Sequence, residues 1–289
     1  MYTDNYAFLR ENMIYCDLHT HSRFSFDGAE HSTPDALCRR ALEVGLTDLA
    51  ITDHCDVNNE VEGIFRIYDS DAAYTAVMEA KEKYKGRLNL LYGIELGNAH
   101  QYPDYAKALL TRHNFEFVIG SLHNLLAVPD FSLMNFERIP DTLTRQLFDR
   151  ALDEMMEMCS FEVDGKCPFT TLGHMTYIHR YVALAKHKMD FTPHLDRIRS
   201  LYELLIKLDI ALELNVSTIT SGLGISMPTL ELLKMYRDAG GRLVTVGSDS
   251  HSPDTLGKSI RKGFALLQAA GFDEVLTVRN GEKVLQKIN

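Results

Sequence analysis

The chain has 289 residues, of which 45% are hydrophobic and 24% charged, and its formal net charge is −10 at pH 7. This composition is ordinary for a globular protein, and no segment approaches the ~18 uncharged apolar residues that a membrane-spanning helix needs. The acidic balance, without a basic stripe, argues against long nucleic acids as partners. The start of the sequence, MYTDNYAFLREN, lacks the basic and then apolar pattern of a secretory signal. We therefore expect a cytoplasmic protein with no membrane partner.

Short apolar runs alternate with segments that carry helical periodicity. In STPDALCRRALEVG, Ser32 or Thr33 can cap a helix, Pro34 suits its first turn and Gly45 its end. Helices are also expected at 143–158 and 253–270, and a long loop at 125–141. The strand-like runs, rich in Leu, Val and Ile, are 14–18, 48–52, 88–95, 115–120, 170–173, 210–215 and 242–247.

This alternation predicts a parallel α/β architecture, and the length suits one domain spanning 1–289. Near-continuous apolar runs such as LTDLAITD indicate strands that are buried on both faces. A closed barrel and an open doubly wound sheet both fit. No G-x-G-x-x-G follows the first strand-like run, which argues against the dinucleotide-binding form of the open sheet.

Histidines and carboxylates stand where the strand-like runs end. His19 and His21 in DLHTHS face one point together if the first strand continues through Thr20. In a barrel, the carboxyl ends of all strands open onto one face, where active sites lie. The later runs end in ITDHCD, YGIELG, VIGSLH, TLGH, LELNVS and GSDSH, which provide Asp53, His54, Glu95, His123, His174, Asn215, Asp249 and His251.

The strand-end residues predict a metal site. A lone histidine is usually structural, and we expect this of His31, His100, His113, His187 and His194, which fall in helical or loop segments. Several imidazoles and carboxylates together exceed the needs of one cation, so we expect a cluster of two or three ions of zinc, iron or manganese. The five cysteines are scattered without a C-x-x-C pair, which argues against thiolate ligands and against a disulfide framework. Glu213 lies inside its strand-like run and is left outside the predicted site.

In this order, the motifs DLHTHS, TDH, GIELG, GSLH, LGH and GSDSH resemble the PHP (polymerase and histidinol phosphatase) family, over Asp17 to about Gly271. The resemblance implies a distorted TIM-like (β/α)7 barrel with three divalent metal ions at the carboxyl face of its parallel strands. Many members carry a histidine where this chain has Asp27. Aspartate can also bind a metal ion, through its carboxylate oxygens. By motif, the ions would be bound by His19, His21, Glu95 and Asp249; by Glu95, His123 and His174; and by Asp27, His54 and His251.

Within the family, the size and the segment GHMTYIHRY are most similar to the histidinol-phosphate phosphatase branch. The resemblance implies that Arg180 contacts the substrate phosphate, for which its planar guanidinium is suited. The branch can also carry an arginine just after the sixth-strand asparagine, whereas here Asn215 is followed by Val216 and Ser217. We expect a phosphomonoesterase that hydrolyses a small phosphorylated metabolite, histidinol phosphate, with a metal-bridging hydroxide and with Asp249 and His251 as catalytic residues.

Three alternative functions stay open at this point. The same chemistry would serve another small phosphate ester, a nucleotide or a short oligonucleotide. A metal-dependent amidohydrolase also begins with H-x-H, but it commonly uses a bridging lysine where this chain has Glu95. A metal-binding protein without activity should have lost some ligands, and this chain has the full set.

Overall fold

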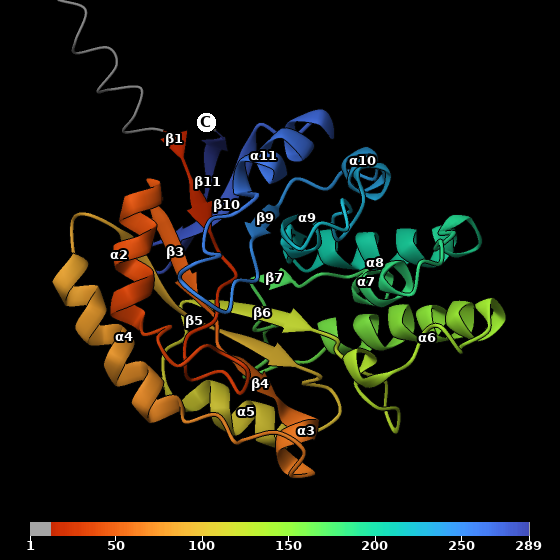
Figure 1. Cartoon of the computed structure of the whole chain (residues 1–289), viewed down its shortest axis with the longest axis horizontal. Helices are drawn as coiled ribbons and strands as arrows, with labels where there is room; N and C mark the ends of the chain where they lie inside the picture. The colour runs from red at the N-terminus through yellow and green to blue at the C-terminus, as the bar shows by residue number, and fades with distance from the viewer. Residues whose placement is uncertain (1–12, 289) are drawn as a thin grey trace, which may run out of the picture.

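The computed structural model describes residues 13–288, and Figure 1 shows its arrangement. Residues 1–12, on which the expectation of no secretory signal rests, and residue 289 lie outside the described residues. An eight-stranded sheet forms the centre. Its strands pair in parallel in the order β2 (Cys16–Asp17), β3 (Asp48–Ile51), β5 (Asn89–Gly97), β6 (Phe117–Ser121), β7 (Thr171–Leu172), β8 (Ala211–Asn215) and β9 (Val244–Gly247), with β4 (His54–Asp56) beside β5.

The first and last strands of this sheet meet, so the sheet nearly closes as a barrel. The amide of Leu18 donates to the carbonyl of Val246 at 3.0 Å, and Thr20 bridges Ser250 in parallel. Seven of the eight strands correspond to the predicted runs, and the predicted barrel-type α/β fold is confirmed. The strands are buried on both faces, as their continuous Leu, Val and Ile content predicted.

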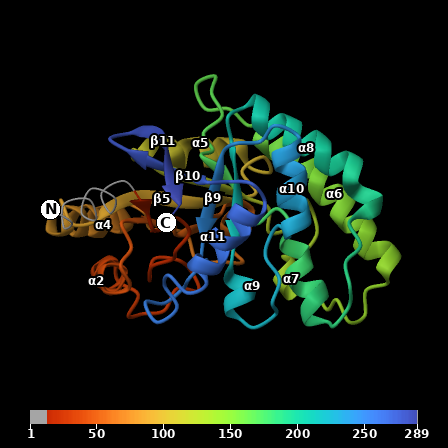
Figure 2. The same ribbon diagram turned by 90° about the horizontal axis from the view of Figure 1, so that it is seen from above.

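Helices cover the outside of the sheet, with α6 and α8 on one side and α2 and α4 on another (Figures 1 and 2). Helix α2 begins as predicted, because the Thr33 hydroxyl accepts from the amide of Ala36 and Gly45 takes the left-handed conformation after the last turn. The helices are α2 (Pro34–Val44), α3 (Val57–Val61), α4 (Ser70–Tyr84), α5 (Pro103–Arg112), α6 (Asp141–Cys159), α7 (Tyr177–Leu184), α8 (Leu195–Lys207), α9 (Ser217–Thr220), α10 (Leu230–Asp238) and α11 (Ile260–Ala269), with 3-10 turns η1 (Phe131–Leu133) and η2 (Thr192–His194).

Two features differ from the expectation. A second sheet of β1 (Met13–Ile14), β11 (Glu282–Ile288) and β10 (Glu274–Arg279) was not predicted; Asn280 and Gly281, both at positive φ, form the tight turn of its hairpin. The helix expected at 253–270 begins only at Ile260, because the left-handed backbone of Ser259 and the turns before it interrupt the helical pattern. Within residues 13–288, no helix combines the length and the apolar character that crossing a bilayer requires.

Candidate metal centre

The side chains that follow the strand ends converge at the carboxyl end of the barrel. Glu95, fully buried in β5, lies at the centre of the group. Its Oε1 is 2.8 Å from Nε2 of His174 and 3.2 Å from Nε2 of His123. Its Oε2 is 3.2 Å from Nε2 of His19 and 2.8 Å from Nδ1 of His54. One carboxylate therefore faces imidazoles that come from four different strand ends.

The remaining predicted ligands complete the three groups. Asp249 Oδ1 lies 3.3 Å from Nε2 of His21, beside His19 and Glu95. Nε2 of His123 and Nε2 of His174 are 3.4 Å apart. Asp27 Oδ2 lies 3.1 Å from Nε2 of His251, and Asp27 Oδ1 lies 3.9 Å from Nε2 of His54. The structure thus brings together all nine side chains: His19, His21, Asp27, His54, Glu95, His123, His174, Asp249 and His251.

The orientation of the imidazoles fits bound cations. Nδ1 of His19 donates to Glu213 Oε1 at 2.6 Å, and Nδ1 of His123 donates to Asp56 Oδ1 at 2.6 Å. By contrast, Nε2 of His19, which faces the centre, is buried without a hydrogen-bond partner among the described residues, as are Nε2 of His21 and Oε2 of Glu95. Imidazoles that bind metals are held in this way, with one nitrogen fixed by a carboxylate and the other free. The nitrogen and oxygen donors, without thiolate, suit zinc, manganese or iron.

A hydrogen-bonded chain orients His21. Ser25 Oγ donates to Asp53 Oδ1 at 3.0 Å, and this hydrogen bond uses the only proton of the hydroxyl group. The ring nitrogen Nδ1 of His21, 3.1 Å from Ser25 Oγ, must then donate to that oxygen, which leaves Nε2 unprotonated in the neutral ring. Asp53 therefore orients the imidazole of His21 through Ser25.

Sequence reasoning missed two supporting carboxylates, Glu213 and Asp56. Besides holding His19, Glu213 accepts from the backbone amide of His174 at 2.7 Å. Glu213 is therefore part of the site, although it was not predicted to be. The signal was its spacing, because Glu213 and Asn215 are two residues apart on β8 and point to the same side. Asp56 ends β4, two residues after His54, and the same spacing applies to it.

Burial and charge set the protonation of the group. Burial opposes protonation of His19, but the carboxylates of Glu213 and Glu95 outweigh it and raise its pKa well above the ordinary value. Burial also lowers the pKa of His21 well below its usual value, and the adjoining imidazoles of His251 and His54 add to this effect. A neutral His21 offers its lone pair to a cation. The raised pKa of His19 and the lowered pKa of His21 therefore both favour a positive charge at the centre.

Arg180, on α7, lies beside Asp249. Its Nη2 donates to Asp249 Oδ2 at 2.9 Å and contacts Ser217 Oγ, while 22% of the side chain stays exposed. Asp249 has a left-handed backbone with φ of 53°, which aspartate tolerates better than most residues and which occurs often at functional sites. The predicted phosphate-binding arginine thus lies at the edge of the ligand group. Its partner Ser217 lies two residues after Asn215.

Gly247 provides the space for His19. A Cβ atom at this position would lie 2.2 Å from His19 Cβ and 2.8 Å from Glu213 Oε1. We expect Gly247→Ala to displace His19, to cost about 1–3 kcal/mol through overpacking, and to lower the bound metal measured by elemental analysis. Gly241→Ala is the matched control, because its Cβ would meet the Tyr236 ring at 2.5 Å, away from the ligand group. An equal metal content in both variants would contradict this role of Gly247.

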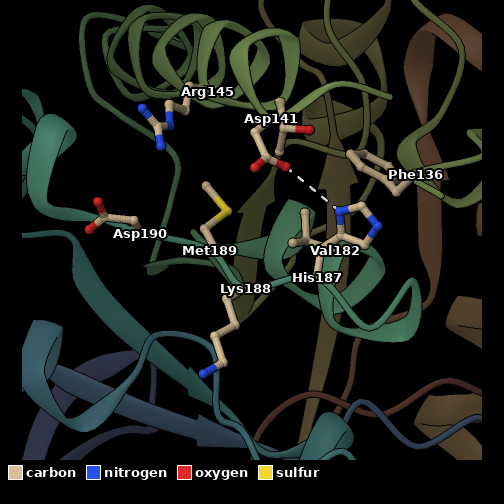
Figure 3. A pocket seen from close by; sticks show the side chains of 9 residues that line it. Phe136, Asp141, Arg145, Val182, His187, Lys188, Met189 and Asp190 are labelled. Carbon is tan, nitrogen blue, oxygen red and sulfur yellow. Dashed lines mark ion pairs between the residues drawn. The ribbon is translucent and has the colours of Figure 1, made fainter. Parts of the chain in front are cut away.

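A cavity of about 270 Å³ opens over the ligand group, and Arg180, Asp249, His251 and His54 line it. Figure 3 shows a different cavity, between Asp141, Arg145 and Met189, where Asp141 and His187 form an ion pair at 3.7 Å. Its volume of about 30 Å³ has room for about one water molecule. The cavity over the ligand group is the candidate substrate site, because the proposed metal ligands and Arg180 line it. Among the described residues, no metal-ligand group includes the five histidines expected to be structural, of which His187 is one.

Known proteins share both the sequence pattern and the fold. The family model described as "PHP domain" matches residues 17–217. A probable histidinol-phosphatase of Thermotoga maritima is 30% identical over 93% of this chain and 97% of its own length. A histidinol-phosphatase of Lactococcus lactis is 24% identical over 90% of this chain and 93% of its own.

A solved structure extends the likeness to the fold. The histidinol phosphate phosphatase from Lactococcus lactis, complexed with zinc, L-histidinol and phosphate, superposes with a TM-score of 0.76. The match covers 94% of this chain and 99% of that one, at 22% identity. Because the family match spans well over half of the 289 residues, and because the ordered motifs meet at one end of the barrel, the chain belongs to the PHP domain family.

Proposed function

We propose that this protein is a metal-dependent phosphomonoesterase whose substrate is histidinol phosphate. The metals would be three divalent ions, of zinc, manganese or iron, bound by the nine side chains described above. The proposal also takes residues 1–289 as one barrel domain, which the continuous hydrophobic core of the described residues supports. The names of the relatives from Thermotoga maritima, Clostridium acetobutylicum and Lactococcus lactis support the substrate.

One observation carries the proposal: buried imidazole nitrogens without hydrogen-bond partners face a shared carboxylate, with a guanidinium at the edge of the same cavity. When bound, divalent ions supply Lewis acidity for phosphoryl oxygens and a lowered pKa for water. Arg180 would donate to the phosphoryl oxygens, where its planar fork matches their spacing. Asp249 would hold Arg180 in place, because its Oδ2 accepts from Nη2.

His251 is proposed to act through Nε2. Its Nδ1 lies 3.0 Å from the carbonyl oxygen of Asp249, which can only accept, so Nδ1 carries the proton. In the neutral ring, Nε2 is then free to hold a cation, as proposed for the third ion. His251 and Asp249 are therefore the proposed catalytic residues, as the sequence analysis expected.

The direct test is release of inorganic phosphate from a substrate panel, with manganese, zinc or iron added to metal-depleted protein. We expect turnover of histidinol phosphate to exceed that of simple alkyl phosphates, nucleotides and short oligonucleotides, and amides to stay uncleaved. Equal turnover of every ester would contradict the proposed substrate. No phosphate release from any ester, despite bound metal, would contradict the proposed reaction class.

Replacing Arg180 by lysine tests the phosphate contact. Lysine keeps the charge but loses the fork, so we expect kcat/KM to fall by about 10- to 100-fold, as for loss of a charge-assisted hydrogen bond. Product inhibition by phosphate should weaken in parallel. Arg150→Lys is the control, because Arg150 is half-exposed on α6 and pairs with Glu154, away from the ligand group. Unchanged phosphate inhibition in Arg180→Lys would contradict the assignment.

A further inference from the structure

One carboxylate in the substrate cavity has no part in the ligand groups proposed above. Asp130 lies in the loop after β6, is only 5% exposed, and lines the cavity together with Arg180 and His123. Its Oδ1 accepts from the amide of Ser132 at 2.7 Å, at the start of η1. The next residue, Phe131, donates its amide to the carbonyl of His123 at 3.0 Å. The carboxylate is therefore fixed relative to the metal centre.

No cationic side chain among residues 13–288 neutralises Asp130. It forms no ion pair with a lysine, arginine or histidine of that region, although a carboxylate oxygen lies within 4.8 Å of a ring nitrogen of His123 and an oxygen of Asp56. The nearby His123 ring already donates Nδ1 to Asp56 at 2.6 Å. A largely buried carboxylate without a cation is costly, so this arrangement calls for a positive group from outside the chain.

The choice lies between a metal ion and an organic cation. A metal ion bound by Asp130, Asp56 and His123 would need a ring nitrogen of His123, but Nδ1 already donates to Asp56 at 2.6 Å and Nε2 faces Glu95 at 3.2 Å in the ligand group proposed above. An ammonium group requires no such change, because it donates hydrogen bonds to the second oxygen of Asp130. The cavity then has a guanidinium at Arg180 for an anionic group and a carboxylate at Asp130 for a cationic one.

We infer that Asp130 is the residue that selects substrates with an ammonium group near the phosphate ester, by pairing with that group. This inference rests on the proposed function. Histidinol phosphate is such a substrate, since its ammonium is attached to the carbon next to the ester carbon. Phosphate esters without this charge leave the Asp130 carboxylate desolvated and unpaired, which penalises their binding.

The test compares Asp130→Asn with the parent protein on histidinol phosphate and on its analogue without the amino group. Asparagine has the same shape and is also a good residue at a helix start, so the turn at η1 should persist. We expect kcat/KM for histidinol phosphate to fall by about 10- to 100-fold, mainly through KM, and the preference over the analogue to shrink by the same factor. Metal content should stay equal to that of the parent.

Asp69→Asn is the matched control, because Asp69 also starts a helix by accepting from an amide, that of Ala72 at 3.0 Å, but is exposed on α4. It should keep the parent preference. Loss of a metal ion in Asp130→Asn would overturn the inference, since it would make Asp130 a metal ligand. An unchanged preference between the two substrates would overturn it as well.

Failure of the proposed function gives a different result. If the parent protein leaves histidinol phosphate uncleaved, that substrate assignment fails, and the same comparison is made with 2-aminoethyl phosphate and ethyl phosphate. A preference for the aminated ester that Asp130→Asn removes would support the inference independently. Equal kcat/KM for these two esters, or cleavage of neither, would overturn it.

Discussion

Glu95→Gln is expected to lose bound metal and nearly all phosphatase turnover. Glu95 is the only described carboxylate that lies close to imidazoles of all three proposed metal groups: Oε1 lies near His123 and His174, and Oε2 near His19 and His54. Glutamine keeps the shape of the side chain but replaces one oxygen and the charge. Because bound cations are worth several kcal/mol of charge stabilisation in such reactions, and because each ~1.4 kcal/mol is tenfold, we expect kcat to fall by at least about a thousandfold.

The measurement combines elemental analysis with phosphate release under saturating metal. Glu154→Gln is the matched control, since Glu154 is also largely buried and bonds a histidine, His100, at 3.3 Å, but lies outside the ligand groups. That variant should lose stability and keep its metal. A full metal complement with parent turnover in Glu95→Gln would contradict the role of Glu95 as the shared ligand.

The placement of the site was predictable because it depends on a rule of geometry. Parallel strands in a barrel point their carboxyl ends to one face, so a histidine or carboxylate after each strand must lie near the others. The pair His19 and His21 and the single residues His123 and His174 all follow from the strand ends. Asp27 was predicted only through the family resemblance, because it lies in a loop, where no periodicity indicates the direction of a side chain.

What the sequence analysis missed depends on contacts between distant segments. Glu213 was left outside the predicted site because it lies inside its strand-like run, yet it bonds His19, from which 194 residues separate it. Its spacing from Asn215 indicates to which side of the strand it points, but not that it would meet His19. Asp130 lies in the segment 125–141, which was expected to be a loop, and only its burial in the cavity distinguishes it from an ordinary residue at a helix start.

The second sheet was missed for a related reason. β10 and β11 carry a hairpin signal, with Asn280 and Gly281 at the turn, but they follow the last strand of the barrel pattern. Their position is fixed by a partly buried ion pair, because Arg279 pairs with the fully buried Asp48 at 2.8 Å. Asp48 also accepts from Asn89 at 2.6 Å, so the hairpin is tied to the amino ends of β3 and β5.

Removal of metal is expected to destabilise the protein strongly. Without cations, the imidazoles of His21 and His251 remain stacked at 4.1 Å with buried nitrogens that lack partners. An ion that binds only the folded state adds about 2.7 kcal/mol when its concentration is 100 times its Kd. Since 1 kcal/mol shifts Tm by roughly 2–4 °C in domains of about 150–250 residues, we expect chelation to lower Tm by at least about 5 °C per ion lost.

The measurement is a thermal unfolding curve before and after chelation, and after return of zinc, manganese or magnesium. Zinc or manganese should restore Tm, whereas magnesium, which prefers oxygen ligands, should restore little, because six of the nine proposed ligands are imidazoles. Glu95→Gln should show a smaller shift on chelation than the parent, since it begins with fewer ions. The contrary result is a parent Tm that stays unchanged although chelation has removed the metal. It would contradict cation binding as the reason why the inward-facing nitrogens have no hydrogen-bond partner. In that case the buried imidazoles would have to be satisfied by water alone, and restoring any metal would leave the unfolding curve unchanged.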